Sequence, residues 1–429
     1  MGAHGSDAFV TTPLLFDEKP LPLPNNASKA ESHDDVPPAN SSFFKTCFHG
    51  INAISGIGIV SIPYAVASGG WLSLSLLFLI AVACYYTGIM VQRCMDMDPN
   101  IRTFPDIGQR AFGQKGRLMV SIAMNSELYL VVAGYLILEG DNINNLIPNL
   151  HIDIGGFTIG GATLSAIVAA LIIMPTVWLQ DLSLLSYVSA TGALASAVFL
   201  LSLLWNAALD GTGFNGKGTV FRWSGIPNAV GLYAFCYSAH PVLPTLYTSM
   251  RNRSRFSSVL AICFSLCTLG YAAAAVLGYL MFGQDVQSQV TLNLPSGELS
   301  SRVAIFTTLV NPIAKYTLML TPTINAAKSM VPSHYNKTLT HLVVSTSLLI
   351  SNLIIAVAIP LYGYLMALAG SLLCVSTSIL VPSVCYLKIS GAYRRFGSDM
   401  IISYSIIAMG VAIAVVGTYS SLLDIIGHL

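Results

Sequence analysis

Eleven apolar stretches divide this sequence of 429 residues. Each meets the length of about 20 residues that a helix needs to cross a bilayer. Strands of an outer-membrane barrel are shorter, at about ten residues, and alternate apolar with polar positions. We therefore expect an all-α integral membrane protein with about eleven transmembrane helices, near 44–67, 71–92, 118–140, 158–175, 183–207, 224–248, 256–281, 303–326, 338–358, 361–387 and 400–424.

The composition agrees with a lipid environment. Charged residues make up 9% of the chain, whereas soluble domains hold about 25%, and the mean hydropathy is +0.69. A net charge of +1 gives no field that would attract nucleic acid, so we expect the bilayer as a partner and no nucleic acid. The eight cysteines lie in or near apolar runs, which indicates buried thiols and not disulfides.

The distribution of Lys and Arg predicts the orientation. With a cytosolic N-terminus, 16 of the 20 Lys and Arg fall on the cytosolic side, and Lys217, Arg222 and Arg302 fall on the other. Lys315 alone lies within a span. The bias places the N-terminus in the cytosol and, after eleven spans, the C-terminus on the luminal side.

The first span contains Ser55-Gly56-Ile57-Gly58 and then Pro63. Each glycine disfavours a helix by about 1 kcal/mol, and the proline cannot donate a backbone hydrogen bond. One interpretation is a glycine packing face with a kink. The other is an interrupted helix whose free backbone lines a cavity, in which case a valine at Gly58 would block binding without preventing insertion.

The sixth span repeats the pattern, with Gly231, then Tyr237-Ser238-Ala239-His240-Pro241, and Pro244. Two interrupted helices, each the first of a block of five, indicate a transporter built from inverted repeats. Free N–H groups at such breaks suit a carboxylate, and free carbonyls suit an ammonium group. A zwitterionic amino acid matches both.

This organisation divides the chain into a polar tail, residues 1–42, and a transmembrane domain, residues 43–429. The tail lacks a sustained apolar run and is expected to be disordered. The domain comprises a first repeat (43–210), a second repeat (222–390) and an appended eleventh helix (398–429).

Six motifs occur in order along the chain: GINAISGIGIVSIPYAVASGGW (50–71), FPDIGQRAFG (104–113), MPTVWLQDLSLLSYVSA (174–190), GLYAFCYSAHPVLPTLYTSM (231–250), GYLMFG (278–283) and LVNPIAKYTLMLTP (309–322). Together they resemble the amino acid/auxin permease family, and most closely its plant and fungal vacuolar amino-acid transporter branch. One departure comes after Pro322, where close relatives tend to have an acidic pair and this chain has Asn325-Ala326-Ala327-Lys328.

The resemblance implies a 5+5 inverted repeat of the amino acid–polyamine–cation type plus one extra helix. It also implies a vacuolar, proton-coupled carrier of neutral amino acids that works as a monomer, with no cofactor, no metal site and no enzymatic activity. By the same likeness the substrate carboxylate would be held by Ser55, Gly56, Ile57 and Gly58, and its amino group by Phe235, Cys236, Tyr237 and Ser238.

Three ionisable residues at membrane depth are candidates for proton coupling or gating. Glu127 and Lys315 would each cost about 2.5–3.5 kcal/mol if charged and facing lipid, so each either lies on a proton pathway or forms a structural pair. A carboxylate near Lys315, such as Glu127, would stabilise its charge. His240, beside the second break, either titrates or bonds to free backbone.

Other classes of function remain open on the sequence alone. A plasma-membrane amino-acid permease, an amino-acid-sensing receptor and a channel could use the same fold. An intramembrane enzyme is disfavoured because the sequence has no HExxH, no GxSxG and no paired intramembrane aspartates. The sequence also lacks a GxxxxGK[ST] loop, so it does not use ATP directly.

The orientation can be tested with protease-cleavable tags. A tag before Met1 should be cut from the cytosolic side, and a tag after Leu429 should be protected from it, because eleven spans place the termini on opposite sides. Cleavage of both tags from one side would contradict the eleven-span topology.

Overall fold

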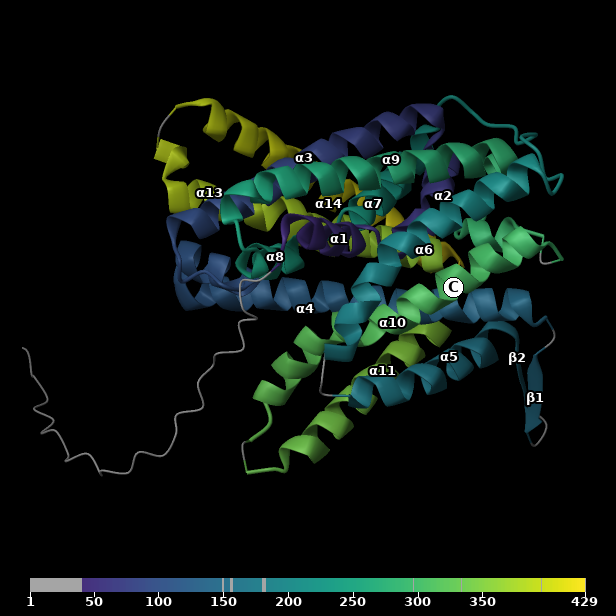
Figure 1. Cartoon of the computed structure of the whole chain (residues 1–429). Coiled ribbons are helices and arrows are strands. Elements are labelled where there is room, and N and C mark those ends of the chain that lie inside the picture. Colours follow the sequence, from purple (N-terminus) through teal and green to yellow (C-terminus); the bar gives the residue numbers. More distant parts are fainter. Residues whose placement is uncertain are drawn as a thin grey trace, which may run out of the picture. The chain divides into compact units, whose positions relative to one another are not determined.

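The computed structural model describes residues 41–148, 150–154, 157–179, 183–295, 297–332, 334–394 and 396–428. The expectation for the tail, residues 1–42, lies almost entirely outside them. Residues Pro38–Leu429 form one compact unit, and helices dominate its described part (Figure 1).

Each of the eleven predicted spans coincides with one helix or one interrupted helix. Eight spans are single α-helices, namely α3 (Leu74–Met97), α4 (Phe104–Leu146), α5 (Gly161–Trp178), α6 (Ser183–Ala208), α9 (Phe256–Phe282), α10 (Leu299–Ser329), α11 (Lys337–Ala358) and α14 (Ser398–His428). Short 3₁₀ turns flank several of them, at η2 (Trp71–Ser73), η3 (Trp223–Gly225), η5 (Arg253–Arg255), η6 (Gly283–Asp285), η7 (Val290–Asn293) and η10 (Ala392–Arg394).

Two spans are interrupted, and a third changes its type of helix along its length. The first consists of α1 (Phe43–Ile54), the 3₁₀ turn η1 (Ile57–Val60) and α2 (Ile62–Gly69). The sixth consists of α7 (Ile226–Cys236), the 3₁₀ turn η4 (His240–Val242) and α8 (Leu243–Ser249). The tenth is a continuous helix in which two π-helical segments, η8 (Ala369–Cys374) and η9 (Ser376–Leu380), separate α12 (Tyr362–Leu368) from α13 (Val381–Ser390).

Length and apolar character identify the membrane spans directly. In the described part of the chain, eight helical segments are long and apolar enough to cross a membrane. The remaining three predicted spans are the interrupted first and sixth, and α6, whose described apolar portion is Leu194–Ala208. Many large apolar side chains face outward, including Leu118, Trp205 and Val415, as expected where lipid replaces water around the protein.

Two local features differ from the sequence-based expectation. The helix of the third span begins at Phe104, earlier than predicted, and is kinked where Phe112 and Gly113 leave helical geometry. Residues 158–160, expected at the start of the fourth span, instead belong to an antiparallel hairpin of β1 (His151–Ile154) and β2 (Phe157–Gly160) at one end of the bundle (Figure 1).

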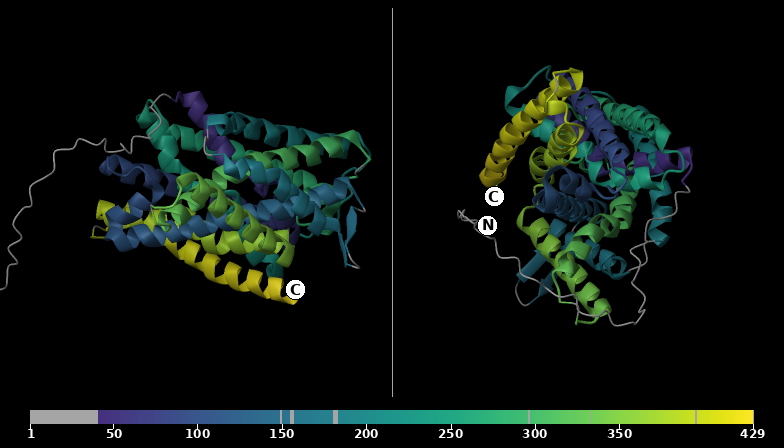
Figure 2. Two further views of the ribbon diagram at one scale, coloured as in Figure 1. Left: turned by 90° about the horizontal axis from the view of Figure 1, so that it is seen from below. Right: turned by 90° about the vertical axis from the view of Figure 1, so that its left-hand side faces the viewer.

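The helices pack around the two interrupted spans. α1 lies against α6 and α9, and α2 against α7 and α9, while α7 also packs on the π-helical segment η8. The segment from Tyr362 to Ser390 has the largest buried share of the long spans, and α14 the smallest. α14 accordingly runs along the outside of the bundle (Figure 2). The appended helix therefore covers the second repeat and does not enter its centre.

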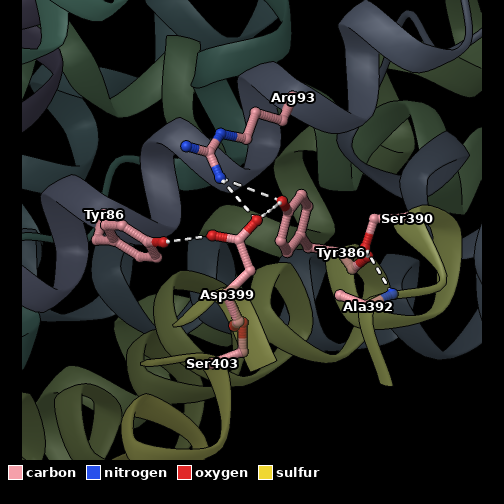
Figure 3. Close-up of polar contacts among 7 residues, drawn as sticks. All are labelled: Tyr86, Arg93, Tyr386, Ser390, Ala392, Asp399 and Ser403. Carbon is pink, nitrogen blue, oxygen red and sulfur yellow. Dashed lines mark hydrogen bonds and ion pairs between the residues drawn. The ribbon is translucent and has the colours of Figure 1, made fainter. Parts of the chain in front are cut away.

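A polar cluster fixes the first turn of α14 to the repeats (Figure 3). The Asp399 carboxylate accepts hydrogen bonds from Tyr386 of α13 (2.9 Å) and Tyr86 of α3 (3.4 Å), and pairs with Arg93 of α3 at 3.5 Å. The side chains of Arg93 and Asp399 are 42% and 45% exposed, so the ion pair itself contributes at most about 1 kcal/mol. The main effect of the polar cluster is to position the eleventh helix, α14.

The eight cysteines are all buried and all carry free thiols. This agrees with the expectation from their positions in apolar runs.

Candidate functional site

The first span is interrupted where the sequence predicts. α1 ends at Ile54, Gly56 is extended with φ −88° and ψ −162°, and the chain resumes as η1. Pro63 lies in the first turn of α2, where its missing N–H has no intrahelical partner to lose. The break exposes the last carbonyls of α1 and the first N–H groups of η1, and Gly56 provides no side-chain cap for those groups.

The sixth span breaks in the same way. α7 ends at Cys236, and Tyr237, Ser238 and Ala239 connect it to η4 and α8. Pro241 and Pro244 lie in the first turns of η4 and α8, so each proline starts a helix. The side chain of Tyr237 is buried and donates to the Thr268 hydroxyl at 2.9 Å.

The two breaks meet. A Cβ atom added to Gly58 would lie 2.6 Å from Sγ of Cys236 and 3.2 Å from its Cα, so only glycine allows the backbones to come this close. The Tyr271 hydroxyl of α9 lies 2.6 Å from the carbonyl oxygen of Ile54 and 3.0 Å from that of Cys236. Its one hydrogen is shared between the ends of both half-helices.

Lys315 of α10 contacts the end of α1 directly. Its ammonium nitrogen is buried and donates to the carbonyl oxygens of Asn52 at 2.9 Å and Ser55 at 3.2 Å. A cation is favourable at a helix C-terminus, where partial negative charge accumulates. Lys315 therefore caps the first half-helix.

Glu127 of α4 binds hydroxyl groups of two other spans. Its carboxylate accepts from Ser238, at the second break, and from Thr377 of η9 at 2.5 Å. Among the described residues no ion pair joins Glu127 to Lys315, so the expectation that Glu127 stabilises the lysine is wrong for this conformation. The hydroxyl of Ser238, expected near the substrate amino group, is bound to Glu127 instead.

His240 is fully buried and bonded to α3. Its Nε2 lies 3.1 Å from the carbonyl oxygen of Cys84 and 2.9 Å from the hydroxyl of Thr87. Because a carbonyl can only accept, Nε2 is the donor in the contact with Cys84, and Nδ1 has no hydrogen-bond partner in the described part of the chain. This is the backbone-bonded arrangement, and a role for His240 in coupling stays a prediction.

A small cavity borders the first break. Its volume is about 20 Å³, enough for one water molecule but too small for an amino acid, so the structure is closed around the site. Oδ1 of Asn311 has no hydrogen-bond partner in the described part of the chain. The lining consists of Gly56, Ile57, Ile59, Val60, Leu138, Ala195, Ser196, Phe199, Thr307, Thr308, Asn311 and Pro312.

The structure thus brings most of the predicted site residues close to the two breaks, and their roles in substrate binding stay predictions. Of the segment expected to hold the carboxylate, Gly56 and Ile57 line the cavity, while Ser55 bonds to Ser196 at 2.5 Å and Gly58 packs on Cys236. Phe235, Cys236, Tyr237 and Ser238 adjoin the break but do not line the cavity.

Sequence reasoning missed the polar residues of other spans that complete the site: Ser196, Tyr271, Thr308, Asn311 and Thr377. Ser, Thr, Asn and Tyr are frequent in membrane helices, so their presence alone carried no signal. Their importance depends on which face of each helix meets the breaks.

Comparison with known proteins decides the family. The family described as transmembrane amino acid transporter protein matches residues 39–423. The chain belongs to this family. The Arabidopsis thaliana protein named amino acid transporter AVT1I is 55% identical over 389 residues, which cover 90% of this chain and 96% of that protein. The resemblance to the amino acid/auxin permease family is confirmed, and a member of a transporter family is not an enzyme.

Solved structures support the fold. A Na⁺-coupled sialic acid symporter in a substrate-bound outward-open state has a TM-score of 0.53 at 12% identity, covering 88% of this chain and 89% of that one. MhsT in complex with L-phenylalanine also has a TM-score of 0.53, at 10% identity, covering 86% of this chain and 98% of that one. These similarities confirm the inverted-repeat transporter fold for this family member.

The structure separates binding from packing at the two glycines of the first break. Gly56→Ala would add a methyl group without a clash, since the nearest atom to its Cβ position is the carbonyl oxygen of Ile54, in ordinary contact at 3.9 Å. We expect a protein that folds normally but binds its amino acid at least tenfold more weakly, about 1.4 kcal/mol, as measured by equilibrium binding to the purified protein.

Gly58→Ala is the matched comparison. In Gly58→Ala, contact of the added methyl group with Cys236 should lower the free energy of unfolding by about 1–3 kcal/mol. The larger side chain of Gly58→Val would make the same contact, so that variant tests packing more than binding. Unchanged affinity in Gly56→Ala would show that the cavity is not the substrate site.

Proposed function

We propose that this chain is a proton-coupled carrier of neutral amino acids that works by alternating access as a monomer in an endomembrane, most specifically the vacuolar membrane. The carriage of amino acids follows from its family. The coupling ion, the class of side chain, the membrane and the monomeric state are our inference.

The observation that carries the proposal is the pair of helix breaks in contact at Gly58 and Cys236. Half-helix ends present N–H groups for a carboxylate and carbonyl groups for an ammonium, and the unpartnered Asn311 Oδ1 adds an acceptor. No charged side chain lines the cavity among the described residues. An amino acid with an uncharged side chain fits this environment best.

Proton coupling is favoured over sodium coupling by the position of Lys315. A sodium ion needs several oxygen ligands, and the Lys315 ammonium group occupies two carbonyl oxygens at the end of α1. In this mechanism the positive charge of the Lys315 ammonium group replaces a sodium ion. Loss of a proton from that group would free the two carbonyl oxygens at the end of α1.

The orientation and the membrane rest on the sequence. The bias of Lys and Arg predicts a cytosolic N-terminus, and eleven spans then predict a luminal C-terminus. The vacuolar location is proposed from the likeness of the motifs to the plant and fungal vacuolar branch. A plasma-membrane permease with the same mechanism is the alternative.

Uptake into proteoliposomes tests the proposal. The purified chain should accumulate labelled neutral amino acids under an imposed pH gradient and not under a sodium gradient. Uptake should saturate with concentration and show exchange, which a channel or a receptor would not. Accumulation that needs sodium would overturn the proposed coupling.

The Lys315→Met variant tests the proposed role of the lysine. The side chain keeps its length but loses its charge, so we expect exchange of labelled for unlabelled substrate to continue and pH-driven accumulation to disappear. Lys328→Met, at a half-buried position near the C-terminal end of the same helix, is the matched control and should accumulate normally. Accumulation in Lys315→Met at the unmodified level would show that Lys315 only caps α1.

A further inference from the structure

A second buried carboxyl lies on α4, about three turns beyond Glu127. Glu139 is 0% exposed, and neither of its oxygens has a hydrogen-bond partner among the described residues. An ionised carboxylate is strongly disfavoured in such a place, whereas the neutral acid is tolerated far better. The closed structure therefore selects the form of Glu139 that carries a proton.

A neighbouring hydrogen-bond acceptor has no donor, and the protonated form of Glu139 carries the hydrogen that such a donor needs. Asn142 lies three residues further along α4, on the same side of the helix. Its Oδ1 is also buried without a partner, while its Nδ2 donates to the carbonyl oxygen of Leu138 at 2.8 Å and to Oε1 of Gln289 at 2.6 Å. Residues three apart on a helix are neighbours, and a protonated Glu139 has the hydrogen that this acceptor lacks.

The network continues into the segment between α9 and α10. Gln289 is fully buried, and its Nε2 donates to Oδ2 of Asp141 at 2.8 Å. Val290 and Thr291 beside it are also fully buried, and Asn145 of α4 donates to the carbonyl oxygen of Thr291 at 3.2 Å. The segment Val286–Leu294 thus packs on this end of α4 through Gln289 and Thr291.

Few titratable groups belong to the elements around Glu139. α5 and η7 contain none, and those of α11, Lys337 and His341, lie at its opposite end. None forms an ion pair or hydrogen bond with Glu139 in the described part of the chain. The titratable or charged groups of the remaining neighbours are Tyr135 and Asp141 within two turns of Glu139 on α4, Asp285 before η7, Arg302, Lys315, Tyr316 and Lys328 on α10, Tyr362 and Tyr364 on α12, and Cys374 on η8.

We propose that Glu139 is a proton-binding site of the transport cycle. Its carboxylate takes up one proton to become the neutral acid, which keeps that proton and donates a hydrogen bond to Oδ1 of Asn142 while the segment Val286–Leu294 is in place. The acid releases the proton to water when that end of the protein opens. The inference rests on the proposed proton-coupled function and adds Glu139 to Glu127, His240 and Lys315 as a candidate for carrying a proton during transport.

Transport by the full-length chain in proteoliposomes tests the site. Glu139→Gln resembles the protonated acid, so labelled substrate should still exchange at half the unmodified rate or faster, while the accumulation ratio under a pH gradient should fall to about one. Glu298→Gln, the same substitution at an exposed residue before α10, should accumulate normally. Normal accumulation in Glu139→Gln would overturn the proposal.

An infrared measurement separates this inference from the proposed function. At neutral pH the unmodified protein should show a protonated carboxylic acid band that Glu298→Gln keeps and Glu139→Gln loses in part. If the unmodified protein does not accumulate substrate under a pH gradient, proton coupling fails. Even then, a weaker carboxylic acid band in Glu139→Gln than in Glu298→Gln would establish that Glu139 binds a proton. Equal bands in the two variants would overturn the proton site whether or not transport is proton-coupled.

A second pair of variants keeps the test valid if Glu139→Gln does not fold. Asn142→Leu removes the hydrogen-bond acceptor of the protonated Glu139, so Glu139 should bind its proton more weakly. The midpoint of the pH dependence of exchange should therefore move about one pH unit lower. Asn145→Leu removes a contact to the same segment without facing Glu139, and its midpoint should not move. Equal midpoints in the two variants would contradict the proposed hydrogen bond.

Discussion

The architecture depends on one constraint: backbone N–H and C=O groups inside a bilayer must find partners within the protein. Two helices are interrupted at mid-span, and each break frees carbonyl groups that water cannot reach. The Tyr271 hydroxyl and the Lys315 ammonium group satisfy those of Ile54, Cys236, Asn52 and Ser55. The positions of α9 and α10 against α1 follow from this requirement, and a substrate that enters must offer equivalent partners before these contacts can change.

Three buried polar side chains are distributed along α4. Glu127 joins the second break to the π-helical part of the tenth span through Ser238 and Thr377. Glu139 and Asn142 lie further along, under the segment that contains Gln289. One helix therefore links the centre of the molecule to one of its ends, which is a suitable arrangement for relating substrate binding to opening at that end.

Much of the fold could be predicted from the sequence, because apolar length and Gly-Pro interruptions are local signals. The eleven spans and both breaks, at Ser55-Gly56 and Tyr237-Ala239, agree with the structure. The hairpin at 151–160 and the π-helical segments carry no comparable pattern. The site was predicted less completely, because the pairing of Glu127 with hydroxyls, the capping by Lys315 and the isolation of Glu139 depend on the facing of distant helices.

The π-helical stretch of the tenth span has a consequence for related chains. A π turn closes its hydrogen bonds over one more residue than an α turn, so Ala369–Cys374 and Ser376–Leu380 hold extra residues without breaking the helix. Each extra residue rotates the side-chain directions of the following helix by about 100°. A helical wheel that treats α12 and α13 as one regular α-helix therefore assigns the side chains of α13 to the wrong face. A relative that lacks one residue here would keep a continuous span, so single-position gaps in alignments belong within this stretch.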